Sequence, residues 1–228
     1  MMRRLLLSLA AILALALSAS PASADALYTL NQGGSLGPTP GTYGTVNLHQ
    51  VGSGSSAYVT VTVTLAAGSK FVGTGAGYAI TWNITGSPSL SSVTVTSANA
   101  ANFTVQGFNP SAGGYKRYKA SPFTGGSCGA TTASCFMYAI DYNISGSGGS
   151  DTSLVFDVKK SGGLLLSDFA ANSSGYYFAS DIFFDGATGN VASNGPPVYV
   201  PEPGTLMLVG AGIGGVAAYR RRRRKQAA

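Results

Sequence analysis

Residues 58–65 constrain the fold more than any other stretch, because their side chains alternate between two chemical types. An apolar residue, valine or leucine, follows at every second position from Val59 onward, and threonine fills the positions between. Successive side chains of a β-strand point to opposite faces, so this period of two predicts a strand with one buried and one solvent-facing side. Such a strand needs neighbours beside it and an apolar layer against its buried face.

Similar short runs of β-branched and aromatic residues recur along the chain. They lie at residues 28–30, 79–84, 92–96, 102–105, 136–144, 154–158 and 175–182. Gly, Pro, Ser or Asn residues bound the runs, and before residue 204 the sequence shows a helical apolar period only for one turn at residues 164–169. We therefore predict an all-β fold, an antiparallel β-sandwich or jelly-roll-like ectodomain.

The N-terminal end has the three parts of a secretory signal peptide. Two arginines begin it, an apolar core follows at residues 5–19, and the small residues Ala22, Ser23 and Ala24 close it. This order predicts export and signal cleavage between Ala24 and Asp25.

The C-terminal end combines a rigid tripeptide, an apolar run and a cationic tail. The residues concerned are Val200, Pro201, Glu202 and Pro203, then the run 206–219, then Arg220, Arg221, Arg222, Arg223 and Arg224. The prolines hold the chain extended, and the arginines resist crossing a membrane. As a helix, the run would be about 21 Å long, against about 30 Å for a bilayer core. We predict a short apolar helix that anchors the chain with the tail at 220–225 in the cytoplasm.

This order of residues resembles the PEP-CTERM sorting signal of Gram-negative bacteria. The resemblance implies that an exosortase-type membrane protease recognises and processes the chain after the secretion machinery has exported it. It also implies an inner-membrane anchor before processing, a later place in the cell envelope or outside the cell, and exopolysaccharide as a partner. Residues 135–195 are similar to the ectodomains of many uncharacterised PEP-CTERM proteins.

Three segments follow from these patterns. We expect a signal peptide at residues 1–24, an exported β-sandwich domain at 25–197, and a sorting and anchor segment at 198–228. The formal net charge of +6 comes from the two ends, because acids slightly outnumber bases in between. A basic isoelectric point therefore gives no reason to expect nucleic-acid binding.

The two cysteines, Cys128 and Cys135, lie in the exported part. Two cysteines in one domain of an oxidising compartment most simply form a disulfide, which we predict here.

The supply of catalytic side chains is small. His49 is the single histidine, and Glu202, inside the sorting tripeptide, is the single glutamate. A zinc site with two histidines from one chain is thereby excluded, and a Ser-His-Asp triad would depend on His49 alone. We therefore expect no catalytic residue, no metal and no cofactor, and a non-enzymatic structural or adhesive protein of the envelope or extracellular matrix.

Two alternatives from other classes stay open. A carbohydrate-active hydrolase would use pairs among Asp168, Asp181 and Asp185, although these residue types are also typical of turns and caps. A binding module would hold calcium at Asp181, Asp185 and Asn190.

A basic and aromatic segment is the other candidate for ligand binding. It consists of Tyr115, Lys116, Arg117, Tyr118 and Lys119. Its rings would stack on sugars and its cations would hold acidic polysaccharide. The simpler interpretation is an exposed strand whose charges discourage edge pairing.

Overall fold

The computed structural model describes residues 25–34, 36, 42–74, 77–106, 117–124, 128, 133–200, 212 and 215. Residues Asp25–Tyr199 form one compact unit. Within the described residues the only helices in it are three single turns of 3-10 helix. The all-β prediction is confirmed.

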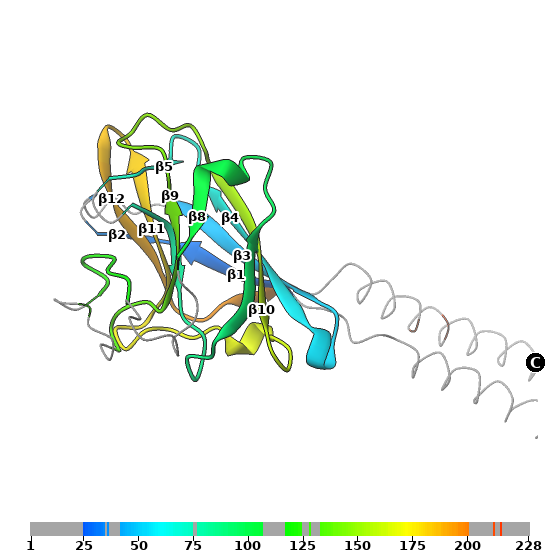
Figure 1. Cartoon of the computed structure of the whole chain (residues 1–228). Helices are drawn as coiled ribbons and strands as arrows, with labels where there is room; N and C mark the ends of the chain where they lie inside the picture. Colours follow the sequence, from blue (N-terminus) through cyan, green and yellow to red (C-terminus); the bar gives the residue numbers. More distant parts are fainter. Residues whose placement is uncertain are drawn as a thin grey trace, which may run out of the picture. The chain divides into compact units, whose positions relative to one another are not determined.

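The strands form two antiparallel sheets (Figure 1). The first sheet has the order β13-β1-β3-β4-β10-β7. Its strands are β1 (Asp25–Leu30), β3 (Gly44–Val51), β4 (Tyr58–Leu65), β7 (Leu90–Val95), β10 (Ser153–Lys160) and β13 (Val198–Val200).

The second sheet has the order β2-β12-β11-β6-β9-β8, with β5 paired to β11 beside this path. Its strands are β2 (Gln32–Gly33), β5 (Lys70–Phe71), β6 (Tyr78–Trp82), β8 (Phe103–Val105), β9 (Tyr138–Tyr142), β11 (Tyr176–Phe184) and β12 (Ala187–Asn194). Two sheets that share one core are consistent with the predicted sandwich.

The core lies between the two sheets and is rich in aromatic rings. Trp82 of the second sheet is fully buried, and its ring centroid lies 5.1 Å from that of Phe156 in the first sheet. Tyr28 of the first sheet and Phe178 of the second make a similar contact at 4.9 Å. Rings that meet edge-on or tilted across the sheets stabilise the packing beyond the area they bury.

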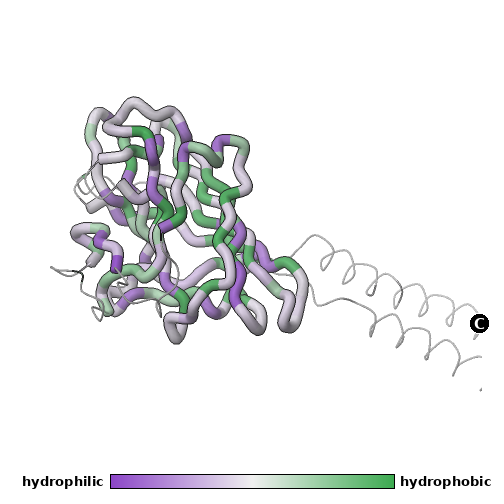
Figure 2. Tube along the Cα trace, in the orientation of Figure 1, coloured by the Kyte–Doolittle hydropathy of each residue, from purple (hydrophilic) through white to green (hydrophobic). Residues whose placement is uncertain are grey.

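The alternation in residues 58–65 is confirmed as β4. Val59, Val61 and Val63 are fully buried, while the threonines between them lie on the outer face. Hydrophobic and hydrophilic residues alternate in this way along several strands of the tube in Figure 2. One threonine, Thr60, donates a hydrogen bond of 2.7 Å to Asp157 on the neighbouring strand.

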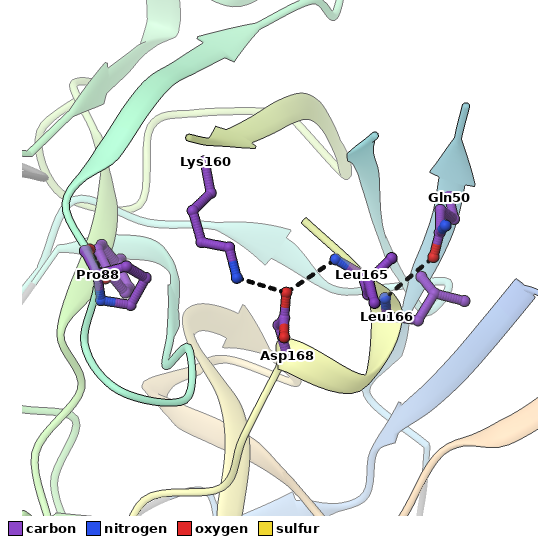
Figure 3. A network of polar contacts seen from close by, with 7 residues as sticks. Gln50, Pro88, Lys160, Leu165, Leu166 and Asp168 are labelled. Atoms are coloured by element: carbon purple, nitrogen blue, oxygen red, sulfur yellow. Dashed lines mark hydrogen bonds and ion pairs between the residues drawn. The ribbon is translucent and has the colours of Figure 1, made fainter. Parts of the chain in front are cut away.

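The helical turn predicted at residues 164–169 is present as η3 (Leu166–Asp168). The carboxylate of Asp168 accepts a hydrogen bond of 3.0 Å from the backbone N–H of Leu165 and forms an ion pair of 2.8 Å with Lys160. The N–H of Leu166 donates to Gln50 (Figure 3). Asp168, the last residue of the turn, therefore satisfies the backbone N–H of the N-cap residue Leu165.

Candidate functional site

A second, smaller apolar cluster covers the outer face of the second sheet. Across neighbouring strands that face carries the small residues Ala192, Ala179, Thr81 and Ala139 in one row. Because these side chains are short, the described residues between 117 and 136, which we call the covering segment, can pack closely against the strands. The rings that it supplies to the cluster are Tyr118, Phe123 and Phe136, with Tyr78 and Tyr176 at the margin.

A cleft of about 770 Å³ opens beside this cluster. The side chains that line it include Tyr78, Lys119, Asp181, Thr188 and Asn190. They come from β6, β11, β12 and the covering segment, so the cleft depends on the packing of the segment against the sheet.

Asp181 reaches the cleft because of the alternation along β11. Phe178 and Ile182 belong to the main core, whereas Ala179 belongs to the outer cluster. Two residues beyond Ala179, Asp181 points to the same outer face. Its side chain is only 4% exposed and accepts a 3.2 Å hydrogen bond from the backbone N–H of Gly77.

Burial governs the charge of Asp181. It raises the pKa from 3.8 to about 6, and the bond from Gly77 offsets part of this rise. Directly opposite on β12 lies Asn190, whose side chain donates a 2.9 Å bond to the carbonyl of Ser121. That bond ties the covering segment to the sheet at the edge of the cleft.

A second carboxylate, the half-buried Asp141 of β9, lies on the same outer face of the sheet. It is the register partner of Tyr78 on the neighbouring strand β6, and it accepts a hydrogen bond from the side chain of Gln106. Its other oxygen, Oδ1, is buried without a hydrogen-bond partner among the described residues. Burial raises the pKa of Asp141 to about 6, against the lowering effect of the Gln106 bond.

Two tyrosines lie next to Asp141. The rings of Tyr78 and Tyr118 meet edge to face with centroids 5.3 Å apart. Burial raises the pKa of both phenols, and the charge of Asp141 adds to the rise in each; for Tyr118 the pKa reaches about 12. Both hydroxyls therefore stay protonated at neutral pH and can donate hydrogen bonds.

The two carboxylates do not form a coupled pair. Burial, and not the charge of the other carboxylate, raises each pKa. A dyad that shares one proton would show mutual repulsion as a main cause. The cleft thus offers a phenol ring, a hydroxyl, an amide, an ammonium and one buried carboxylate, a mixture that suits recognition of a polar, neutral ligand.

The other carboxylates that the sequence suggested as partners of Asp181 lie apart from it in the structure. Asp168 caps η3, as described above. Asp185 and Gly186 form the two-residue turn between β11 and β12, both with positive φ (47° and 82°). Asp185 lies four positions beyond Asp181, about 13 Å along an extended strand. Of the calcium candidates only Asp181 and Asn190 face each other, and the described residues contain no cluster of three metal-binding side chains.

The basic and aromatic segment is described only from Arg117 onward; Tyr115 and Lys116 lie outside the described residues. Tyr118 is 6% exposed, forms an isolated bridge with Phe136, and packs into the outer cluster. Lys119 is exposed and lines the cleft. The ring that lines the cleft is Tyr78, which sequence reasoning missed.

His49 lies on the other sheet, far from these residues in the fold. Its Nδ1 is 2.7 Å from Oδ1 of Asp25, whose other oxygen accepts a 3.1 Å bond from Asn47. Although burial acts in the opposite direction, these two bonds lower the pKa of Asp25. This exposed pair anchors the start of β1.

The disulfide between Cys128 and Cys135 is present. Cys135 is fully buried, and the bond closes a short loop within the covering segment, shortly before β9 begins.

Comparison with known proteins identifies the C-terminal end. The family model of the PEP-CTERM protein-sorting motif matches residues 200–224. No curated protein and no solved structure matches the chain. Of the matched residues, Pro201, Glu202, Pro203 and 220–224 lie outside those described, as do Ala22 and Ala24 of the predicted cleavage site.

Among the described residues no helix is long and apolar enough to cross a membrane. The helix expected at 206–219 falls outside them, apart from Gly212 and Gly215. The motif itself implies export, recognition by a membrane-embedded exosortase, and sorting to the cell envelope or the extracellular space. The chain carries a PEP-CTERM protein-sorting motif.

Proposed function

We propose that the chain is a non-enzymatic structural or adhesive protein of the cell envelope or extracellular matrix, and that its cleft binds exopolysaccharide. The observation that carries this proposal is Asp181, a carboxylate held 4% exposed at a cleft beside a tyrosine ring and several polar groups. Sugars are bound by such combinations, because their hydroxyls need donors and acceptors while their C–H faces pack on rings.

The size of the cleft supports a small sugar unit. Its volume of about 770 Å³ falls in the usual range of roughly 300–1,000 Å³ for ligand sites. Asp181 accepts hydrogen bonds, Lys119 donates them, and Thr188 does both. One saccharide unit of a longer polymer therefore fits the cleft, with the rest of the polymer outside.

The arrangement favours binding over hydrolysis. Glycosidases place two carboxyl groups about 5–9.5 Å apart across the scissile bond, one as acid and one as base or nucleophile. Here Asp181 lines the cleft, whereas one oxygen of Asp141 is fully buried and the other is engaged by Gln106. Asp141 is therefore poorly placed to reach a substrate.

Co-sedimentation with the host's exopolysaccharide tests the proposal. Replacing the exposed cleft residues, Lys119→Ala with Thr188→Ala, should raise the dissociation constant at least about tenfold, which corresponds to about 1.4 kcal/mol. Lys159→Ala, on the first sheet, is the matched control and should bind like the wild type. If the cleft variant binds the polymer as tightly as the wild type, the cleft is not the binding site.

A reducing-end assay on the same polymer tests the hydrolase alternative. The binding proposal expects no release of reducing ends by the wild type. Release that disappears in Asp181→Asn would instead support an enzyme.

A further inference from the structure

The last strand of the first sheet has an unusual surface. All three residues of β13 are exposed apolar side chains: Val198 at 66%, Tyr199 at 56% and Val200 at 46%. Among the described residues, Leu165 is the only other large hydrophobic side chain with comparable exposure. An edge strand with a free row of backbone groups and apolar side chains invites pairing with another chain, and proteins normally protect such edges with charge.

The strand is held extended by its surroundings. It lies next to β1 at the end of the first sheet, so among the described strands none lies beside its other backbone edge. Burial, with Tyr177 and Tyr199 as neighbours, raises the pKa of Tyr28 on β1, which places Tyr199 close to that residue. Pro196 and Pro197 precede the strand and favour an extended entry.

The strand also runs directly into the sorting motif. The family model begins at Val200, which is the last residue of β13. No linker therefore separates the edge strand from Pro201, Glu202 and Pro203. Because this apolar edge strand continues directly into the motif, the protein that would bind both is the protease that recognises the motif.

We propose that Val198 and Tyr199 extend the surface that the membrane-embedded processing protease recognises, and that the protease pairs with the free edge of β13 by strand addition. In this mode backbone hydrogen bonds supply affinity, and side chains on alternate faces supply specificity. Because β1 holds β13 extended, the complete recognition segment exists in the folded ectodomain and is lost when β1 and β13 separate. The protease thereby selects folded chains. This inference does not depend on what the cleft binds.

Two insertions in the full-length chain, expressed in its own host, test the proposal. A flexible Gly-Ser linker of about six residues between Tyr199 and Val200 leaves the matched motif intact but separates it from the rest of β13. The same linker between Gly195 and Pro196 is the control, because it keeps β13 continuous with the motif. We expect the first insertion to lower the rate of processing at least about tenfold and the control to be processed as the wild type. Equal processing of the two insertion variants, whether both retained or both lost, would overturn the proposal.

Side-chain substitutions provide a second test that leaves the chain length unchanged. Val198→Ser with Tyr199→Ser removes the apolar surface at exposed positions, so the ectodomain should keep its thermal unfolding temperature. Leu165→Ser, which is 44% exposed and lies far along the chain from the motif, is the control. The double variant should accumulate unprocessed protein and the control should not. Normal processing of a folded double variant would show that the protease reads the motif alone.

Discussion

Replacing Asp181 by asparagine should stabilise the protein at neutral pH and leave its stability nearly unchanged in acid. In the folded protein burial holds the pKa of this carboxyl at about 6, above its ordinary value of 3.8. The folded state therefore binds the proton more tightly than the unfolded state. The stability associated with the neutral carboxyl is fully present below about pH 4 and is lost as the pH rises through about 6.

The magnitude follows from the two pKa values. At about 1.4 kcal/mol per pH unit, a rise from 3.8 to about 6 makes the ionised carboxylate cost about 3 kcal/mol of unfolding free energy above pH 7. The amide in Asp181→Asn carries no charge and keeps an oxygen that accepts the N–H of Gly77. In a domain of this size about 3 kcal/mol corresponds to a rise in melting temperature of about 6–12 °C.

Thermal unfolding followed by circular dichroism between pH 4 and pH 8 measures the effect. The difference between variant and wild type should be near zero at pH 4 and grow through pH 6 to its full value above pH 7. Asp185→Asn is the matched control, because it makes the same change of charge at the exposed turn of the same hairpin and asparagine also tolerates positive φ there. A difference that is constant with pH, or a variant less stable than the wild type at pH 7.5, would refute the reasoning.

Three further predictions concern the outer cluster, the disulfide and the sorting tripeptide. Ala179→Leu overfills the row of small residues in the outer cluster and should cost about 1–3 kcal/mol in urea unfolding; an unchanged midpoint would show that the covering segment packs loosely. Removing the disulfide with Cys128→Ser and Cys135→Ser should cost about 2–3 kcal/mol, because the loop it closes is short, and a loss above about 5 kcal/mol would contradict that entropy argument. Changing residues 201–203 to alanine should leave an uncleaved, membrane-retained form on immunoblots of membrane fractions, and normal maturation would remove the tripeptide from the account.

The main strands could be predicted because their burial pattern is local. In β4 the alternation of valine and threonine alone indicates which face is buried. β3 was not expected, although Val46 and Leu48 alternate with polar residues there. Only two apolar positions alternate in this way, and the glycines and prolines before them suggest a continuous turn region.

The cleft could not be predicted in the same way, because its residues come together only through long-range pairing. The hydrogen bond from Gly77 to Asp181 joins residues 104 positions apart. Nothing near Tyr78 in the sequence indicates that β11 brings a carboxylate beside it. The row of alanines is similarly invisible, since each alanine alone is an ordinary strand residue and the row exists only in the register of four strands.

The measurement that tests the account most directly is the intact mass and location of the mature protein from its own host. Fractionation into membrane, envelope and extracellular matrix, followed by mass spectrometry, determines both. The account predicts a form that lacks residues 1–24 and the tail from 206 to 228, recovered with the exopolysaccharide outside the inner membrane. A full C-terminal tail in the inner-membrane fraction would contradict it, because the terminus would then act as a permanent anchor.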